Sequence, residues 1–293
     1  MNAGLDRIAR GISSEIESEL ERIGLLFRIF DRAKSEESLK RKLERKKYHL
    51  DSNGKLMQDL IGIRVVLYFK DDIPLVYKAL KSKFEFVDET IDEAEETVFA
   101  PNRINLIFRL KKDYQEEVTD TIIRDYRYID TTYEVQIRTM LSEGWHEIEH
   151  DLRYKCSEDW EDFQELSRTL NGLYAALETN DWSILSLFDK LAYEHYKAKN
   201  LPAMLRNKFR VRVSNEPIEP ALMKVINNSD DNLIKQILRV DRNEFLNQIF
   251  DDGVKFPITL SNLVYVINGY YIKDRALLNI TPSYITDKKA IFR

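Results

Sequence analysis

The sequence contains a single cysteine, Cys156, among 293 residues. One cysteine excludes an internal disulfide and a zinc site built from several cysteines, and it fits a reducing compartment. There is also no run of eighteen apolar residues, and the first ten residues lack the apolar segment of a secretory signal. We therefore expect a cytoplasmic protein that has no part in a membrane.

Nor does the sequence have a large excess of charge of either sign. Its formal net charge is −5, so the composition as a whole gives no signal for nucleic-acid binding. A surface that binds phosphate must then be a local cluster of basic residues. Apolar residues make up 43% of the chain, which allows a buried core and argues against disorder.

Apolar spacing predicts alternating helices and strands in the first half of the chain. Residues 61–69 are almost continuously apolar, as in a central strand covered on both faces, and residues 131–138 alternate between apolar and polar. We expect a further strand at 103–110, and helices at 5–23, in the basic segment 32–47, at 72–83 and from about 140 onward. This pattern is typical of an α/β domain, with a mixed β-sheet flanked by helices.

Beyond residue 160 only helical patterns remain. Three- and four-residue spacing predicts a core stripe on a long helix, formed by Leu166, Leu170, Leu173, Leu177, Ile184 and Leu187. Pro202 and residues 214–220 then interrupt the pattern. We place a domain boundary near residue 200, with the α/β domain at 1–200 and an all-helical C-terminal domain of unknown role at 201–293.

Aromatic residues are frequent in the C-terminal helices. They are Trp182, Tyr193, Phe245, Phe250, Tyr265, Tyr270 and Tyr271. A core position is the default expectation for aromatic residues in amphipathic helices. An oligomer interface or a surface for a protein regulator stays open as an alternative.

A basic segment follows the first helix. If it is helical, Ser38 and Lys42 share one face, while Arg32 and Lys34 project from the turn before it. Several cations and a hydroxyl that converge from one side suit a triphosphate. The alternative is the solvated face of a charged helix.

Two charged residues accompany the apolar strand. Asp59 stands at its mouth, where a carboxylate can bind Mg²⁺ together with substrate phosphates. Arg64 lies inside the strand, where a guanidinium is costly unless it meets a carboxylate, a phosphate or an aromatic face. An internal ion pair of Arg64 with Asp59 or Glu134 would explain it equally well.

The polar face of the alternating strand carries Glu134, Gln136 and Arg138. A carboxylate there, opposite Asp59, can hold a metal ion or accept a proton from an attacking hydroxyl. A sheet face that is simply exposed to water is the alternative.

The next helix contains a competing motif. The segment His146-Glu147-Ile148-Glu149-His150 satisfies the H-E-x-x-H pattern of zinc hydrolases. Short motifs match by chance in glutamate-rich helices, and zinc hydrolysis would leave the polar strand face unused. We therefore keep a zinc hydrolase only as a remote alternative.

Taken in order, these segments resemble the synthetase domain of the RelA/SpoT family, including its small stand-alone members. The resemblance covers roughly residues 25–160 and depends on four elements. They are Arg32-x-Lys34-x-x-x-Ser38-x-x-x-Lys42, Asp59-x-x-Gly62-x-Arg64, Glu134-Val-Gln136-Ile-Arg138-Thr139 and Trp145-x-x-x-Glu149-His150-x-x-x-Tyr154-Lys155. The resemblance implies a nucleotidyltransferase-like fold and a Mg²⁺-dependent pyrophosphokinase, which moves the terminal pyrophosphate of ATP to a ribose hydroxyl.

The resemblance also implies a role for each matched residue. Asp59 would bind Mg²⁺, and Glu134 would be a second metal ligand or would activate the attacking hydroxyl. Arg32 and Arg64 would enclose the adenine. The full ATP-binding set would be Arg32, Lys34, Ser38, Lys42, Arg45 and Arg64. The residues that support the acceptor or the transferred group would be Gln136, Arg138 and His150.

One element departs from the family pattern. The family has a Tyr-x-Ser-x-His stretch whose tyrosine stacks on the guanine of the acceptor, whereas this chain has Arg103, Asn105 and Ile107 at those positions. Arginine can also stack on a base, so we expect Arg103 and Asn105 to support the acceptor. The acceptor itself stays open. It is a guanine or adenine nucleotide, which gives an alarmone-like product, or the 3′ end of tRNA, as in the toxic small synthetases.

Two further alternatives follow from the resemblance. A tRNA acceptor would need a basic surface, for which residues 199–212 are a candidate, although an exposed linker would explain them too. A catalytically degenerate synthetase that senses ATP or an alarmone is the other alternative. The presence of both Asp59 and Glu134 argues against a sensor, because binding alone does not need both carboxylates. An antitoxin or regulator at the C-terminal helices, and an oligomer, are partners that we keep open.

Overall fold

The computed structural model describes residues 3–46, 56–91, 104–120, 128–229 and 232–292. The chain divides into two compact units, one formed by residues 1–18 and 27–181, the other by residues 19–26 and 182–293. This division falls within one long helix, α6 (Gln164–Lys197), whereas the sequence placed a boundary near residue 200.

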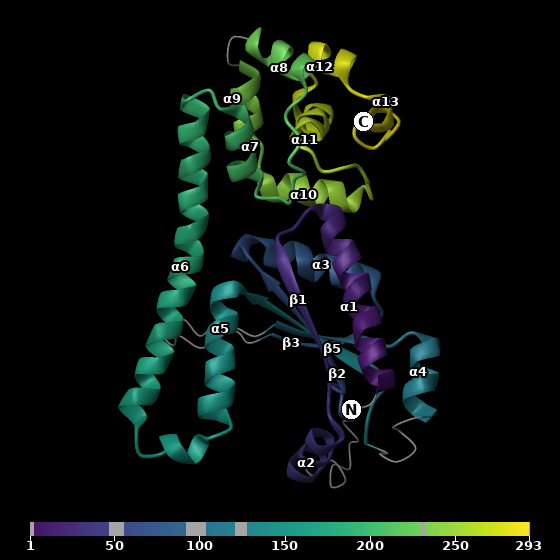
Figure 1. Cartoon of the computed structure of the whole chain (residues 1–293), viewed down its shortest axis with the longest axis vertical. Coiled ribbons are helices and arrows are strands. Elements are labelled where there is room, and N and C mark those ends of the chain that lie inside the picture. The colour runs from purple at the N-terminus through teal and green to yellow at the C-terminus, as the bar shows by residue number, and fades with distance from the viewer. Residues whose placement is uncertain (1–2, 47–55, 92–103, 121–127, 230–231, 293) are drawn as a thin grey trace. The chain divides into compact units, whose positions relative to one another are not determined.

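The first unit is built on a mixed sheet, which has five strands in the described residues (Figure 1). Its strands are β1 (Phe27–Ala33), β2 (Ile61–Leu67), β3 (Phe86–Ile91), β4 (Ile104–Arg109) and β5 (Thr132–Thr139). The strand order is β1-β2-β5-β4-β3, with β2 and β5 parallel and the other neighbours antiparallel. The predicted α/β class with a mixed sheet is confirmed.

One face of this sheet forms the core of the unit. Its buried residues alternate along the central strands, as side chains in strands do. They include Ile61, Ile63, Val65, Leu67, Leu106, Phe108, Tyr133, Val135 and Ile137. Helix α1 (Ala3–Ile23) packs on this face, since its buried Ile12 lines a small cavity together with Tyr133.

The two edge strands were not predicted from the sequence. Arg32 was expected in a turn before a helix, but it lies in β1, where it pairs with Gly62. Only Phe27 is buried in β1, and β3 has no buried residue. An edge strand with few buried positions shows little apolar alternation, so the usual strand signal is absent.

Helices connect and flank the strands of the first unit. They are α2 (Glu36–Lys46), α3 (Ile73–Lys83), α4 (Lys112–Val118) and α5 (Met140–Glu149), followed by a π-helical turn (His150–Tyr154) and α6. The core stripe predicted for α6 was wrong in part, because Leu166 and Leu173 are 58% and 56% exposed and Leu187 is exposed as well. Tyr174, Leu185 and Ala192 are buried instead.

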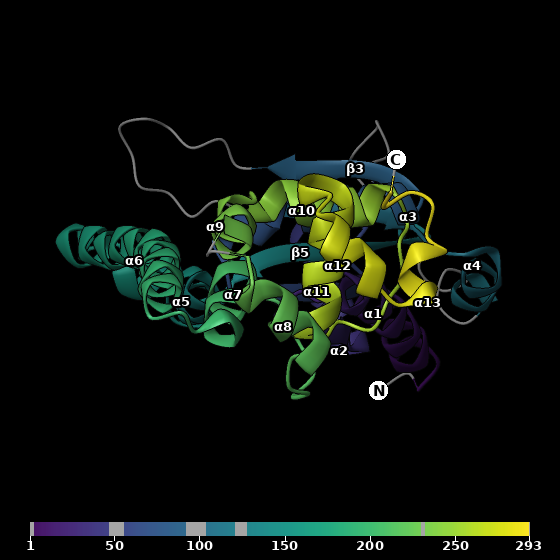
Figure 2. The same ribbon diagram turned by 90° about the horizontal axis from the view of Figure 1, so that it is seen from above.

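The second unit is helical in its described residues. Its helices are α7 (Leu201–Phe209), α8 (Pro220–Asn227), α9 (Asn232–Arg239), α10 (Arg242–Asp251), α11 (Leu260–Ile267), α12 (Arg275–Ile280) and α13 (Ser283–Thr286). Every residue of α11 is buried, and the other helices of the unit lie around it (Figure 2). None of the helices described in either unit combines the length and apolar content that crossing a membrane requires.

The aromatic residues of the C-terminal helices are divided between core and surface. Phe245, Phe250 and Tyr265 are buried, as expected. Trp182, Tyr193 and Tyr271 are exposed, so the core prediction was wrong for these three. Helical spacing shows that two aromatic residues share a face, but it does not show whether another element covers that face.

We expect Phe108→Ala to destabilise the first unit by about 3–5 kcal/mol. Phe108 is fully buried, and its ring lies within 5.6–6.1 Å of the rings of Phe84, Phe86 and Tyr133. Urea unfolding followed by circular dichroism measures the loss. Phe30→Ala is the matched control, because Phe30 is 55% exposed and should cost less than about 1 kcal/mol. Equal losses in the two variants would contradict this account of the core.

Candidate active site

The face of the sheet opposite the core carries the polar side chains. Two rows of residues cross it, because residues directly opposite one another in neighbouring strands share a face. One row is Arg32, Gly62, Glu134 and Ile107, and the next is Phe30, Arg64, Gln136 and Asn105. Predicted site residues from four strands therefore meet on one surface.

Asp59 lies just before β2, between two lysines. Lys34 Nζ donates to Asp59 Oδ2 at 2.8 Å, and Lys42 Nζ donates to the same oxygen at 2.5 Å. The backbone N–H of Lys34 also donates to the carbonyl of Leu60 at 2.9 Å, which holds Lys34 beside the carboxylate. Burial raises the pKa of Asp59, but the two ammonium groups outweigh it, so the pKa lies below its ordinary value.

The second oxygen of Asp59 has a different environment. Oδ1 is buried and has no hydrogen-bond partner among the described residues. A buried carboxylate oxygen without a partner is costly. Such an oxygen can serve as a ligand for a cation, and Mg²⁺ commonly binds one or two carboxylates together with phosphate oxygens.

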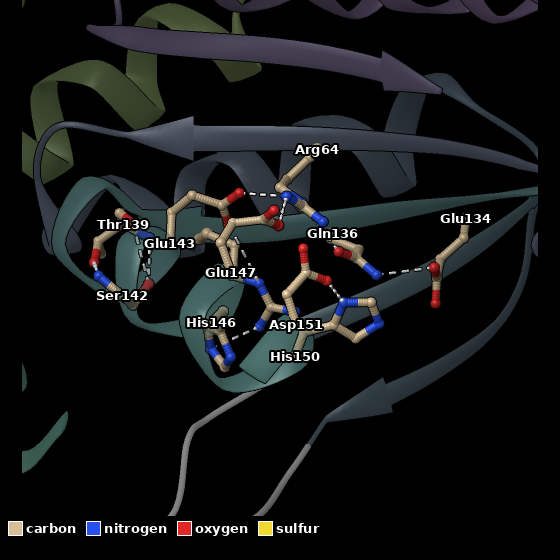
Figure 3. Close-up of polar contacts among 11 residues, drawn as sticks. Arg64, Glu134, Gln136, Thr139, Ser142, Glu143, His146, Glu147, His150 and Asp151 are labelled. Carbon is tan, nitrogen blue, oxygen red and sulfur yellow. Dashed lines mark hydrogen bonds and ion pairs between the residues drawn. The ribbon is translucent and has the colours of Figure 1, made fainter. Parts of the chain in front are cut away.

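Glu134 lies on β5, close enough to Asp59 for the two charges to interact. Burial, and then the charge of Asp59, raise the pKa of Glu134 above its ordinary value, against smaller opposite effects of Gln136 and the two lysines. Gln136 Nε2 donates to Glu134 Oε2 at 2.9 Å (Figure 3). A carboxylate with a raised pKa is a better proton acceptor than an ordinary glutamate.

Arg64 does not pair with Asp59 or Glu134, the internal partners that the sequence suggested. Its Nη1 donates to carboxylates of Glu143 and Glu147 in α5, and its Nε donates to Gln136 Oε1 at 3.3 Å (Figure 3). Burial alone would lower the pKa of Arg64, but the two carboxylates raise it overall. The two carboxylates of α5 therefore compensate for the desolvation of the Arg64 guanidinium in an otherwise apolar strand.

Helix α5 begins at a defined point. The side chain of Thr139 accepts from the backbone N–H of Ser142 at 3.1 Å, and the Ser142 hydroxyl accepts from the backbone N–H of Thr139 at 3.0 Å. This reciprocal pair is a capping box. It fixes where the helix starts after β5, and with it the position of Glu143 in the first turn.

The two histidines of the H-E-x-x-H motif serve different partners. His146 Nε2 lies 3.1 Å from Nη1 of Arg138, and both side chains are buried. His150 is exposed, and its Nδ1 lies 2.9 Å from Asp151 Oδ1. In the described ranges no group of three or more His, Cys, Asp or Glu residues is placed to hold a metal ion. These contacts weigh against the zinc hydrolase.

The other predicted site residues occupy several environments. Arg32 is exposed on β1, and the backbone N–H of Ser38 donates to Ser35 Oγ at 3.3 Å in the first turn of α2. Asn105 lies on β4 opposite Gln136, and its Oδ1 is buried and has no hydrogen-bond partner in the part of the chain that the structure describes. Arg103 lies outside the described residues, as does the side chain of Arg45.

Sequence reasoning assigned no site role to Glu143, and it did not place Phe30 on the polar face of the sheet. A signal for Glu143 was present, because Glu143 and Glu147 are one helical turn apart and directly follow a strand that carries Arg138. Phe30 gave no signal, since β1 itself was not predicted.

Residues 31–159 match the family model described as the region found in RelA / SpoT proteins. The GTP pyrophosphokinase YjbM of Bacillus subtilis (strain 168) is 30% identical over 105 residues, which are 34% of this chain and 44% of the relative. The match thus spans less than half the length of this curated relative. The matched residues 31–159 contain the four motifs, from Arg32 to Lys155, on which the resemblance depends.

Two solved structures resemble this chain at low identity. Small alarmone synthetase 1 from Bacillus subtilis bound to its product pppGpp has a TM-score of 0.48 and 21% identity, covering 65% of this chain and 95% of that structure. A GTP pyrophosphokinase family protein from Streptococcus pneumoniae has a TM-score of 0.48 and 19% identity, covering 69% and 93%.

Proposed function

We propose that this chain is a Mg²⁺-dependent pyrophosphokinase that transfers the terminal pyrophosphate of ATP to a ribose hydroxyl. The observation that carries the proposal is the environment of Asp59, which has Lys34 and Lys42 on one oxygen, an unpartnered buried second oxygen and Glu134 nearby. The two lysines can bind a triphosphate, Asp59 can bind a metal ion, and Glu134 can accept a proton at the same site. The RelA/SpoT region over the same residues supports this activity.

Asp59 and Glu134 are the residues that would hold Mg²⁺. The unpartnered Oδ1 of Asp59 fits this role, and two carboxylates are a normal protein contribution to a Mg²⁺ site that is completed by phosphates and water. Bound there, the metal ion supplies positive charge that stabilises the phosphate oxygens during transfer.

The lysines and arginines bind ATP in this proposal. Lys34 and Lys42 exchange the carboxylate of Asp59 for phosphate oxygens, assisted by Ser38 and Arg45. Arg64, with Arg32 in the neighbouring row, contacts the adenine base. The planar guanidinium suits a base because it stacks on aromatic faces.

The transfer step then uses Glu134 as the proton acceptor. The acceptor hydroxyl oxygen forms a bond to the β-phosphorus of ATP, and the bond from that phosphorus to the oxygen bridging to the α-phosphate breaks, so that AMP leaves. The hydroxyl proton passes to the Glu134 carboxylate. Gln136 orients this carboxylate through its hydrogen bond to Oε2.

A nucleotide is the acceptor that we favour over the 3′ end of tRNA. Asn105, on β4, has a side-chain oxygen without a partner among the described residues, which suits a hydrogen bond to the acceptor nucleoside. A tRNA would need a continuous basic surface, and two of the five basic residues of segment 199–212 form ion pairs within their own unit. Arg210 is buried, with Asp189 at 3.4 Å, and Arg212 pairs with Glu21 at 3.0 Å.

Transfer of radioactive label tests the proposal. The purified chain is incubated with Mg²⁺ and ATP labelled at the γ-phosphate, and with GDP, GTP, unlabelled ATP or total tRNA as acceptor. We expect label on a nucleotide, and label on tRNA would instead identify the RNA acceptor. ATP binding without transfer to any acceptor would overturn the proposal in favour of a nucleotide sensor.

We expect Lys42→Ala to raise the KM for ATP by about tenfold with a smaller effect on kcat, because one charge-assisted contact to phosphate is lost. Lys40→Ala is the matched control on the same helix, since Lys40 is exposed and pairs with Glu36 at 2.8 Å. Steady-state kinetics measure both variants. Equal effects of the two substitutions would show that α2 contributes only general positive charge.

A further inference from the structure

We infer that Glu143 is a positioning residue, which holds the guanidinium of Arg64 by its edge so that the flat faces stay available to a purine base. This inference rests on the proposed function, because Arg64 is assigned there to the adenine. It adds Glu143 to the proposed nucleotide-binding residues and gives helix α5 a part in the selection of the nucleotide.

The hydrogen bonds that Arg64 makes with the described residues lie at the edge of its guanidinium. The N–H groups of a guanidinium lie in its plane, so bonds from Nη1 to Glu143 and Glu147 and from Nε to Gln136 occupy edges rather than faces. The side chain remains 33% exposed. Such a guanidinium is prevented from rotating and is pre-organised to stack on a base.

The two carboxylates on Arg64 are not equivalent. The side chain of Glu147 is 53% exposed, so its ion pair is screened by water and contributes little. The side chain of Glu143 is only 14% exposed. We therefore assign the positioning role to Glu143 and treat Glu147 as an auxiliary contact.

Glu143 also lies between two arginines from parallel neighbouring strands. Its Oε1 accepts from Arg64 of β2, while its Oε2 is buried, makes no hydrogen bond with the described residues and lies 4.0 Å from Nε of Arg138 in β5. A largely buried ion pair often stabilises a fold no more than apolar residues of similar size would. A gain in stability therefore does not explain why Glu143 lies between two guanidinium groups. Orientation of the two arginines gives this arrangement a functional reason.

A chain of hydrogen bonds connects the pair of Glu143 and Arg64 to the proposed proton acceptor. Gln136 donates a hydrogen bond to Glu134, and Arg64 donates hydrogen bonds to Gln136 and Glu143 (Figure 3). A base stacked on Arg64 is thereby fixed relative to the carboxylate that receives the proton. Loss of Glu143 should weaken recognition of the base while leaving the phosphate contacts at Lys34 and Lys42 in place.

Equilibrium binding of two ligands by the full chain tests this inference without requiring turnover. The ligands are a non-hydrolysable ATP analogue and inorganic tripolyphosphate, which lacks the base. We expect Glu143→Gln to weaken binding of the analogue by about tenfold and to change binding of tripolyphosphate by less than about twofold. Glu147→Gln should weaken the analogue by less than about threefold.

Glu178→Gln is the matched control, because Glu178 is a part-buried carboxylate of the same unit that pairs with Lys70 at 2.6 Å. It should leave both affinities unchanged. The inference would be overturned if Glu143→Gln lost affinity equally for both ligands, or if it lost no affinity for the analogue. A wild-type chain that binds tripolyphosphate as tightly as the analogue would also overturn it.

Arg64→Lys provides a second variant if Glu143→Gln folds poorly. It keeps the charge but removes the planar faces, so it should cause the same selective loss of the analogue. In the double variant, Glu143→Gln with Arg64→Lys, the two losses of affinity for the analogue should not add, because both substitutions remove the same contact to the base. If the wild type binds the analogue selectively but transfers no pyrophosphate, the proposed function fails while this inference stands.

Discussion

Asp59→Asn is expected to reduce pyrophosphate transfer by about a thousandfold or more, while metal-free ATP binds as tightly as before or more tightly. The first effect follows because asparagine lacks the charge of the proposed Mg²⁺ ligand. The second follows because Lys34 and Lys42 both donate to one oxygen of Asp59. Without the carboxylate, both ammonium groups are released for the triphosphate.

The opposite signs of these two effects make the experiment decisive. Transfer is measured with γ-labelled ATP and Mg²⁺, and metal-free binding is measured by titration of ATP in the presence of a chelator. Glu178→Gln serves again as the control, since it too removes a carboxylate that a lysine contacts. If Asp59→Asn retains transfer but weakens metal-free binding, then Asp59 only positions the lysines and is not a metal ligand.

The central strands could be predicted from the sequence, and the edge strands could not. Strand β2 is buried on its core face along its whole length and on both faces from Val65 to Leu67, and the middle of β5 alternates between buried and part-buried positions. Both patterns are direct consequences of burial and are therefore visible in the residues. The edge strands β1 and β3 bury one residue between them, Phe27, so burial leaves no pattern there.

The residues around Asp59 were identified from the sequence, but their mutual contact was not. Lys34 and Lys42 are 25 and 17 residues away from Asp59 along the chain. Their meeting depends on the pairing of β1 with β2, which brings the start of α2 to the mouth of the central strand. Pairing between distant segments is a property of the fold and is not encoded in local spacing.

The partners of Arg64 were wrong for a related reason. Helix α5 carries three glutamates, and helical spacing groups Glu143 with Glu147 but does not show which face meets the sheet. In the structure these two face Arg64, whereas Glu149 pairs with Arg153 at 3.4 Å. Apolar spacing on α6 likewise did not show which face is covered, because Tyr174, Leu185 and Ala192 are buried whereas Leu166, Leu173 and Leu187 are exposed.

Glu134→Gln is expected to reduce transfer by about a thousandfold with little change in ATP binding. Glutamine has nearly the same shape, and its carbonyl oxygen can still accept the hydrogen bond from Gln136 Nε2. The geometry of β5 is therefore preserved, while the proton acceptor and the second metal-binding carboxylate are lost. Loss of the charge also relieves the repulsion between Glu134 and Asp59, so the fold should not be destabilised.

The Mg²⁺ dependence of this variant separates the two roles of Glu134. Single-turnover transfer is measured at saturating ATP over a wide range of Mg²⁺ concentration. If Glu134 acts mainly as a metal ligand, high Mg²⁺ should restore much of the rate, because mass action compensates for weaker binding. If it acts as the proton acceptor, high Mg²⁺ should restore little. A variant that keeps its rate within about threefold of the wild type would exclude both roles, since a positioned proton acceptor alone contributes about a hundredfold or more.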